Sequence, residues 1–420
     1  MDDDGTDVVY RHAAGIDISK SDAKICVRHL PVGGRRARSG QPRVFGSTMS
    51  QVRSAGRWLV SEGVEHVVME STSAYWKTWW DGLRDCGFVM TLSNAHMVKQ
   101  LKGRKTDMSD AAWLAKLAML DMAPASFVPP AEIQDLRLAT RARAKQVRRM
   151  TSVTASLEKL LESTGMKLSD VSSKLLTVSG RAILEQVCAG NTDPVVLAGF
   201  SRLRNVTGQP LVEALESRIR PVHSRLIRSH LDMIDNLTTQ IASLGHEIER
   251  LSRPFEHQVW LLDTIPGIDQ LLARSIIGEI GVDMSVFPTA RRLAAWAGVA
   301  PGSYESAGKT RPAGARKGDK HLKVLLSQAA QSAVPVKDSF YRARFHRVRA
   351  RRGEAKAYTA VAHSIILTIW SILTNDEPYR ELGGDYYTRT ATTAQRARLQ
   401  AKAEATLDRL GVDYTINDTD

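Results

Sequence analysis

Four acidic residues in the first 110 positions have the types and spacing that bind metal cations. Asp17 lies near the end of the apolar, β-branched stretch VVYRHAAGIDI, and Glu70 ends the short apolar run HVVME. Asp107 and Asp110 stand three residues apart in KTDMSDAAWLA, where a helix is expected to begin, so both lie on one helix face. A carboxylate that ends a buried strand is costly to desolvate alone. We therefore expect Asp17 and Glu70 to share a cation.

The chemistry of such a cluster follows from its ligands. Carboxylate oxygens select Mg²⁺ or Mn²⁺, and two such ions about 3.5–4 Å apart can clamp the attacking and leaving oxygens of an in-line phosphoryl displacement. The alternative for Asp107 and Asp110 is helix N-terminal capping, a common role of acids. Acids at strand ends and on a later helix, taken together, favour the metal site and match a ribonuclease-H-like layout.

A second candidate is the segment PGSYESAGKT, which resembles a phosphate-binding loop at its end. Gly302 and Gly308 enclose five residues where that motif has four, and the preceding RRLAAWAGVA predicts a helix instead of a buried strand. We therefore reject nucleotide binding. Ser306 is followed by small residues that allow a nucleic-acid backbone to approach, and Ser303 and Tyr304 are rival nucleophiles.

Cations follow this serine closely and could stabilise negative charge on a reacting phosphate. They are Lys309, Arg311, Arg316, Lys317 and Lys320. The alternative is a basic surface segment with an incidental serine. The residues alone leave both interpretations open.

The charge balance favours a polyanionic partner. Lys and Arg number 58 against 45 Asp and Glu, a net charge of +13, which is typical of nucleic-acid-binding proteins. Basic residues at helical spacing predict contacts to a phosphate backbone, although a solvated helix face is the alternative. They are Arg137, Arg141 and Lys145 on one helix face, with Arg143, Arg148 and Arg149 nearby, and Lys102, Arg104 and Lys105 beside the acids.

The elements that position these residues fall into four predicted regions. Strand and helix signals alternate over residues 1–125, which predicts an α/β sheet. The segment APASFVPPAE has three prolines and marks a boundary. A helical and coiled-coil region is expected over 126–255, a helical domain with the serine segment over 256–380, and a C-terminal helix and tail over 381–420.

A heptad repeat in the second region predicts a coiled coil between two copies of the chain. Isoleucine at its first position and leucine at its fourth favour a parallel two-stranded coil, although His230 replaces the first leucine. The alternative is an intramolecular hairpin with the helix expected over 136–161. The predicted dimer residues are Ile227, Ile234, Leu237, Ile241, Leu244, Ile248 and Leu251.

Other protein classes are disfavoured. Cys26, Cys86 and Cys188 are far apart and outside any zinc-ligand pattern, which fits a reducing cytoplasm. We expect neither a signal peptide nor a transmembrane span, because no run of about 18 apolar residues occurs.

Several motifs together resemble one family. GIDISK, VVMESTSAYW and LKGRKTDMSDAAWLAKL resemble the N-terminal, Holliday-junction-resolvase-like domain of DEDD-type insertion-sequence transposases. Three later segments resemble the C-terminal transposase domain of that family, whose members act as bridge-RNA-guided serine recombinases. These segments are LDTIPGIDQLLARSIIGEIG, RRLAAWAGVAPGSYESAGKTR and GARKGDKHLKVLLSQAA. The similar segments run in one order over about residues 8–375.

The resemblance implies a site and partners. The family's four metal-binding acids correspond to Asp17, Glu70, Asp107 and Asp110, and its nucleophilic serine to Ser306, which would form a covalent phosphoserine link to DNA. Family members often have a second serine where this chain has Glu305.

The implied partners are Mg²⁺, donor and target DNA, a structured bridge RNA and further copies of the chain. Dimers would assemble into tetramers, with the acids of one protomer meeting the serine of another. Two alternatives stay open: a Mg²⁺-dependent junction resolvase or nuclease without serine chemistry, and a non-catalytic nucleic-acid scaffold.

Overall fold

The computed structural model divides the chain into two compact units, Met1–Val128 and Pro129–Asp420. The division falls inside the proline-rich segment that was expected to be a boundary. The finer division at residues 255 and 380 stays a prediction. The residues described are 8–31, 37–71, 73–101, 109–171, 175–201, 208–302, 304–306, 309–311, 318–390 and 393–410.

The first unit is built on a mixed sheet, which is six-stranded over the described residues, with the order β3-β2-β1-β5-β6 and β4 also paired with β2. The first strands pair antiparallel, whereas β1, β5 and β6 run parallel to one another. The strands are β1 (His12–Ile18), β2 (Asp22–His29), β3 (Arg38–Ser39), β4 (Arg43–Gly46), β5 (His66–Glu70) and β6 (Val89–Ser93).

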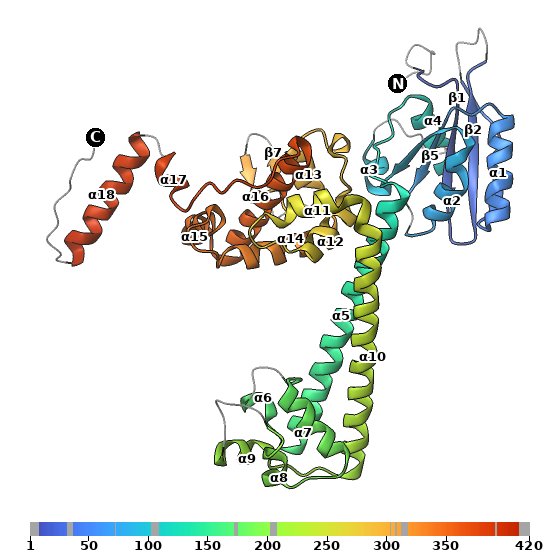
Figure 1. The fold of residues 1–420 in the computed structure, drawn as a ribbon. Helices are drawn as coiled ribbons and strands as arrows, with labels where there is room; N and C mark the ends of the chain where they lie inside the picture. The colour runs from blue at the N-terminus through green and yellow to red at the C-terminus, as the bar shows by residue number, and fades with distance from the viewer. Residues whose placement is uncertain are drawn as a thin grey trace. The chain divides into compact units, whose positions relative to one another are not determined.

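Helices cover both faces of this sheet (Figure 1). On one face, Leu59 and Trp79 pack with strand residues such as Ile16 and Met69 in a single buried cluster. The other face packs against Trp113 and Leu114 of the last helix. The helices are α1 (Met49–Ser61), α2 (Trp76–Leu83), α3 (Ala95–Gln100) and α4 (Asp110–Met119).

A glycine sets the distance between α4 and the central strand. A β-carbon at Gly15 would lie 2.2 Å from the Ala111 carbonyl oxygen and 2.3 Å from the Ala115 amide nitrogen. Only a residue without a side chain allows the helix backbone to approach β1 this closely. The unit is compatible with the predicted ribonuclease-H-like fold, and the chain after it is mostly helical, as expected.

The second unit begins with two long helices that lie side by side, α5 (Ala131–Thr164) and α10 (Pro221–Ser252) (Figure 1). Short helices fill the far end of the pair and share a buried cluster with both, which includes Leu157, Leu161 and Ile183. The short helices are α6 (Leu168–Val171), α7 (Val178–Cys188), α8 (Pro194–Ala198) and α9 (Gln209–Leu215).

This pairing corrects the predicted coiled coil between two copies. Ile227 and Ile234 of α10 are buried in the same cluster as Leu157 and Leu161 of α5, so the alternative of an intramolecular hairpin is what the structure has. The first apolar layer uses Leu231 in place of His230, a step of four residues that fits packing onto α5. Of the other predicted dimer residues, Leu237 and Ile248 are buried within the chain, and Ile241, Leu244 and Leu251 are half-buried.

Where the rest of the second unit is described, its regular elements are helical apart from one small hairpin, in which β7 (Tyr304–Ser306) pairs antiparallel with β8 (Lys309–Arg311). Two 3₁₀ turns lie at Arg253–Phe255 and Met284–Val286. The helices are α11 (Glu256–Asp263), α12 (Gln270–Ile280), α13 (Ala290–Trp296), α14 (Lys320–Ala333), α15 (Phe340–Arg352), α16 (Glu354–Asn375), α17 (Tyr386–Arg389) and α18 (Thr393–Leu410).

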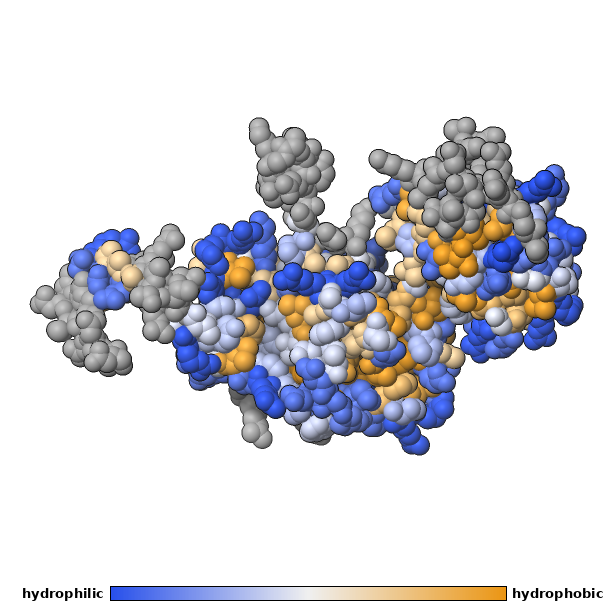
Figure 2. All heavy atoms as spheres, turned by 90° about the horizontal axis from the view of Figure 1, so that it is seen from above, coloured by the Kyte–Doolittle hydropathy of each residue, from blue (hydrophilic) through white to orange (hydrophobic). Residues whose placement is uncertain are grey.

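One described helix, α16, has the length and apolar composition to cross a membrane, in contrast to the expectation of no such run. Its apolar side chains, such as Val361, Ile365 and Ile369, are buried, and α13, α14 and α15 pack against it. The composition of α16 therefore follows from its central place in this unit. Figure 2 shows hydrophilic residues over much of one face, with apolar residues in groups between them.

Candidate active site

Strand register brings two of the predicted acids to neighbouring strand ends. In the parallel pair of β1 and β5, Ile16 lies opposite Met69, and the next residues along the two strands are Asp17 and Glu70. Ile16 and Met69 face the cluster beneath α1 and α2. Because successive side chains of a strand alternate between faces, both carboxylates lie on the face that α4 covers.

The third acid comes from the start of α4. Asp110 is the first residue of this helix, but the side chain that caps the helix is Ser109, whose hydroxyl accepts a hydrogen bond of 3.3 Å from the Ala112 amide. Ser109 is therefore the capping residue, and Asp110 lies in the first turn, where an acid is favourable for the helix as well. Close packing of α4 on Gly15 brings the N-terminus of the helix to the end of β1 that carries Asp17.

The electrostatics of Asp17 reflect this arrangement. Burial raises the pKa of the Asp17 carboxyl above its usual range, and the charge of Asp110 raises it further, although Lys24 opposes the shift. A carboxyl whose ionisation is disfavoured by burial and by a neighbouring acid is a place where a cation is stabilising. The residues present thus fit a divalent metal, with oxygen ligands of the kind that Mg²⁺ prefers.

The fourth acid, Asp107, lies outside the described residues, as do Lys102, Arg104 and Lys105 beside it. In the part of the chain that is described, no three His, Cys, Asp or Glu side chains form a group close enough to hold a metal ion. Asp17 and Glu70 lie at neighbouring strand ends on one sheet face, and Asp110 lies at the start of α4, which covers that face. Their joint role in metal binding, with Asp107, stays a prediction.

The serine segment is a hairpin where a loop was expected. Ser306 is the last residue of β7 and lies opposite Lys309 of β8 in the register. The side chains of residues 303–317 lie outside what the structure describes, and these include Ser306, Lys309, Arg311, Arg316 and Lys317. Lys320 begins α14 and is exposed.

The two ends of this segment meet backbone to backbone. A β-carbon at Gly318 would lie 2.3 Å from the Gly298 amide nitrogen and 2.5 Å from the Trp296 carbonyl oxygen. The Asp319 amide donates a hydrogen bond of 2.9 Å to that same carbonyl. The hairpin is therefore closed at its base between α13 and α14.

Two of the predicted nucleic-acid contacts are internal, which corrects that prediction. Arg137 donates hydrogen bonds of 2.8 and 2.6 Å to the carbonyl oxygens of Gly278 and Glu279. Arg141 donates bonds of 2.8 and 2.6 Å to the two carboxylate oxygens of Glu279, and a bond of 3.2 Å to Asp319. Their guanidinium groups are thus used to join α5 to α12 and α14.

The same network explains how a buried acid is tolerated. Glu279 is 1% exposed, and a charge in such a place requires a partner with hydrogen-bonded geometry. Burial opposes the charge of Arg141, but its bonds to Glu279 and Asp319 outweigh this effect and raise the pKa of the guanidinium. For Arg137, burial lowers the pKa despite the attraction of Glu279.

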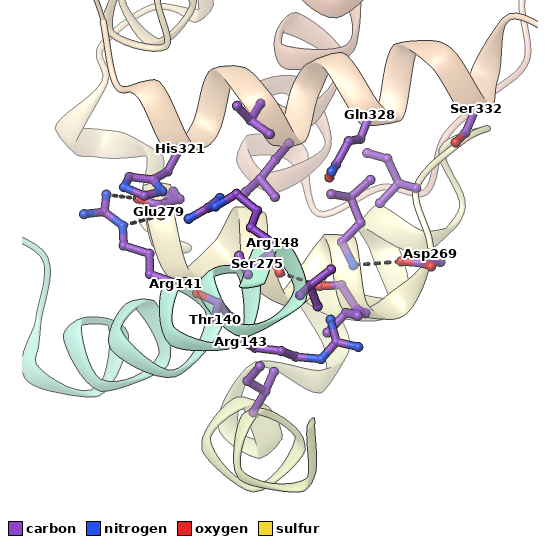
Figure 3. A pocket seen from close by; sticks show the side chains of 18 of the residues that line it. Thr140, Arg141, Arg143, Arg148, Asp269, Ser275, Glu279, His321, Gln328 and Ser332 are labelled. Atoms are coloured by element: carbon purple, nitrogen blue, oxygen red, sulfur yellow. Dashed lines mark hydrogen bonds and ion pairs between the residues drawn. The ribbon is translucent and has the colours of Figure 1, made fainter. Parts of the chain in front are cut away.

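The other basic residues of α5 are more accessible. Lys145, Arg148 and Arg149 are exposed, and Arg143 is half-buried. Arg143 and Arg148 line a cavity of about 620 Å³ between α5, α12 and α14. Figure 3 shows this cavity, with His321, Gln328 and Ser332 of α14 across from the arginines of α5 and Asp269 at the start of α12. The role of Arg143, Lys145, Arg148 and Arg149 as phosphate contacts stays a prediction.

Sequence reasoning missed Glu279 and Asp319 as functional candidates. The signal for Glu279 is a single acid in the otherwise apolar run SIIGEIG, where an ionised side chain faces the interior of the unit. Asp319 caps α14 by accepting a 2.8 Å hydrogen bond from the Leu322 amide. Capping alone would explain an acid at that position, so its ion pair with Arg141 has no local signal.

Comparison with known proteins supplies the family. Residues 14–166 match a DEDD model of the IS110 group described as a transposase, and residues 260–346 match the model described as "Transposase IS116/IS110/IS902 family". The first match contains Asp17, Glu70, Asp107 and Asp110, and the second contains Ser306.

Two relatives agree with these matches. The transposase for insertion sequence element IS1111A of Coxiella burnetii is 24% identical over 295 residues, which cover 69% of this chain and 72% of the relative. A candidate transposase of Sinorhizobium fredii, y4pF/y4sB, is 25% identical over 191 residues, 44% of this chain and 47% of that protein. The chain therefore belongs to the IS110 family of DEDD transposases, enzymes that cut and rejoin DNA.

Proposed function

We propose that this chain transposes an insertion sequence by a serine recombinase mechanism that a structured bridge RNA guides. The observation that carries the catalytic part is the register of β1 and β5, which supports a shared role for Asp17 and Glu70, with Asp110 nearby at the start of α4. Ser306 lies in a separate hairpin of the second unit. Two kinds of group, carboxylates and a hydroxyl, would act on the same phosphate.

The carboxylates of Asp17, Glu70, Asp107 and Asp110 would hold a divalent cation, Mg²⁺ or Mn²⁺. When bound, such an ion neutralises phosphate charge and polarises the phosphoryl oxygens. The raised pKa of Asp17 means that a bound cation would favour its charged form. The acids themselves would fix where the scissile phosphate lies.

In the reaction, the Ser306 hydroxyl oxygen would attack the phosphorus of the DNA backbone. A bond forms between that oxygen and phosphorus, the bond from phosphorus to one deoxyribose oxygen breaks, and the serine proton leaves as the freed sugar oxygen gains one. The phosphoserine conserves the bond energy, so a second sugar hydroxyl can attack it and rejoin the strand. Basic residues after Ser306 would stabilise the charge that develops on the phosphate.

The partners follow from the same proposal. Donor and target DNA and a structured bridge RNA would bind a chain whose net charge is +13, and sequence choice would come from base pairing, as in RNA-guided nucleases. The exposed Lys145, Arg148 and Arg149 of α5 support contacts to phosphate backbones. The site of action would be the cytoplasm.

We also propose that dimers assemble into a tetramer, so that the acids of one copy meet Ser306 of another. The contact between copies would use a surface other than the isoleucine face of α10, because Ile227 and Ile234 are buried within the chain. This part of the proposal rests on the family resemblance.

The test is covalent trapping on cognate donor and target DNA with the bridge RNA and Mg²⁺. We expect a protein–DNA adduct in the native chain and in Tyr304→Phe, and none in Ser306→Ala. Omission of the RNA tests guidance in the same assay. An adduct that forms at the correct site without the RNA would contradict the proposal that a bridge RNA guides the reaction. Full activity in Asp17→Ala and Glu70→Ala would contradict metal catalysis by these acids.

A second candidate function is a Mg²⁺-dependent junction nuclease without serine chemistry. It is favoured by the placement of Asp17 and Glu70 at neighbouring strand ends, with Asp110 at the start of α4, which needs no contribution from the hairpin. Strand cleavage that survives in Ser306→Ala, with no covalent adduct in the native chain, would establish this second function.

A further inference from the structure

The base of the serine hairpin is joined to α5 through one arginine. Arg141 forms paired hydrogen bonds to the Glu279 carboxylate, with Nε at 2.8 Å and Nη2 at 2.6 Å. The same Nη2 donates at 3.2 Å to a carboxylate oxygen of Asp319. Figure 3 shows the side chain of Arg141 extending from α5 to Glu279 of α12. A planar guanidinium that holds two acids at once fixes their relative position.

Asp319 connects this arginine to both ends of the hairpin. One of its carboxylate oxygens accepts from the Leu322 amide at 2.8 Å and begins α14, and the other accepts from Arg141. Its own amide donates to the Trp296 carbonyl of α13 at 2.9 Å. One residue therefore ties α5, α13 and α14 together where the segment 299–318 leaves and re-enters the unit.

The backbone segments at this junction are packed against each other without room for a side chain. A β-carbon at Gly318 would lie 2.3 Å from the backbone of Gly298, and Gly298 itself has a φ of +70°, which favours glycine. The two ends of the segment are thus in direct contact. A shift of Asp319 therefore also acts on the backbone of Trp296 and Gly298, from which the chain continues toward β7.

The contacts of Arg141 argue against its predicted role at a phosphate. Three of its hydrogen bonds go to carboxylates, and Glu279 is 1% exposed and needs the positive charge beside it. Withdrawal of Arg141 toward a nucleic acid would leave that buried acid with less compensation. Arg143, two residues along α5, faces the cavity and provides the matched comparison.

We propose that Arg141 is a positioning residue, which acts through Asp319 and Glu279 to hold the Ser306 hairpin at a fixed place against α5. This inference rests on the proposed role of Ser306 as the attacking residue. Helix α5 begins at Ala131, directly after the acid-bearing unit that ends at Val128. The helix that follows the carboxylates in the chain is therefore the one that holds the hairpin.

The experiment compares Arg141→Lys and Asp319→Asn with the control Arg143→Lys in the full-length chain. Lysine keeps the charge of Arg141 but loses the paired geometry, and asparagine keeps the helix cap of Asp319 but loses the ion pair. Backbone hydrogen exchange of the 299–319 peptide, without nucleic acid, reports on the hairpin. We expect exchange about 10-fold faster in both test variants and unchanged in the control.

A second readout is the single-turnover rate of adduct formation on cognate DNA and RNA, measured beside DNA affinity. We expect the two test variants to react about 10- to 100-fold more slowly, since small displacements of a reacting group have effects of this size. Their DNA affinity should stay within about twofold of the native value, because no phosphate contact is lost. Exchange in α16 serves as the check that the unit remains folded.

The outcomes separate the two proposals. Weaker DNA binding in Arg141→Lys, with native exchange in the 299–319 peptide, would overturn the positioning role and make Arg141 a phosphate contact. Native adduct rates in both test variants would overturn it as well. An adduct that persists in Ser306→Ala would instead refute the proposed nucleophile, and the exchange measurement would then decide alone whether Arg141 holds the hairpin.

Discussion

In the first unit, Asp17 and Glu70 are placed by strand register and by apolar packing of α4 against Gly15. In the second unit, the segment that contains Ser306 re-enters at Asp319, which a network of ionised side chains joins to α5 and α12. The first arrangement depends on short-range patterns of strands and helices. The second joins residues 138 and 178 positions apart. The two parts of the candidate site are thus expected to respond differently to changes in packing and in charge.

The largest effect is expected where apolar packing is closest. In Gly15→Ala, the new methyl group overlaps the backbone of Ala111 and Ala115, and α4 must move away from β1. We expect a loss of about 3 kcal/mol or more in the stability of the first unit, because overpacking against backbone is not relieved by side-chain rotation. Hydrogen exchange of the β1 and α4 peptides would measure it.

The control for this change is Gly46→Ala at the end of β4. A β-carbon there has its nearest neighbour at 3.5 Å, an ordinary contact with Gln51. We expect its effect to stay within about 0.5 kcal/mol. Equal exchange in the two variants would show that the approach of α4 to β1 does not position the acids.

The long helix pair of the second unit adds a third case to the comparison of packing with charge. Apolar packing, and not the ionised network around Arg141, holds α5 and α10 together. Ile234 is 5% exposed and its neighbour Met233 is 50% exposed. We expect Ile234→Asp to destabilise the α5–α10 pair by about 3–5 kcal/mol, because it removes apolar contacts and buries a charge. Thermal unfolding and exchange of the α10 peptides would measure the loss.

Met233→Asp is the matched change on the exposed face. We expect little loss of stability from it, and light scattering would show whether the oligomeric state changes. A folded monomer from Ile234→Asp, with native thermal stability, would contradict the intramolecular pair. A folded monomer from Met233→Asp would place a contact between copies on the exposed face of α10.

The smallest effect concerns the charge of Asp17. Its folded-state pKa is raised by burial and by Asp110, so its ionised form is less favourable in the folded than in the unfolded chain. At neutral pH we expect Asp17→Asn to raise the Tm. The gain in the free energy of unfolding should be no more than about 0.5 kcal/mol, because solvent screens the group. The gain should disappear as the pH falls below about 3.9, where both states are protonated.

Addition of Mg²⁺ sharpens this test. An ion that binds only the folded state raises the Tm, and we expect a larger rise in the native chain than in Asp17→Asn. Thermal scans at several pH values, with and without Mg²⁺, give both measurements. A lower Tm for Asp17→Asn at neutral pH would show that the carboxylate is stabilised in the fold, contrary to the expected sign.

The positions of Asp17 and Glu70 at strand ends could be predicted from the sequence, because the signals for them are local. Apolar runs that end in an acid placed Asp17 and Glu70 at strand ends, and the proline-rich segment marked the end of the unit. The partner of α10 could not be predicted in this way. An isoleucine every seven residues has the same period whether the partner is a second copy or α5, and only the use of Leu231 in place of His230 separates the two.

The ionised network was hidden for a similar reason. Arg137 and Arg141 belong to a stripe of basic residues, and such a stripe usually faces solvent or phosphate. Their partner Glu279 lies far along the chain in an apolar run. The hairpin strands YES and KTR are too short to give a strand pattern. Tertiary contacts, which local propensity does not contain, determine all three features.

The length of α5 sets how far apart the two ends of the second unit's long helix pair lie. A helix of 34 residues is about 50 Å long at 1.5 Å per residue. The cluster formed with α6–α9 lies at its C-terminal end, and Arg141 lies near its N-terminal end. Since B-form DNA rises by about 3.4 Å per base pair, a helix of this length equals the rise of roughly fifteen base pairs.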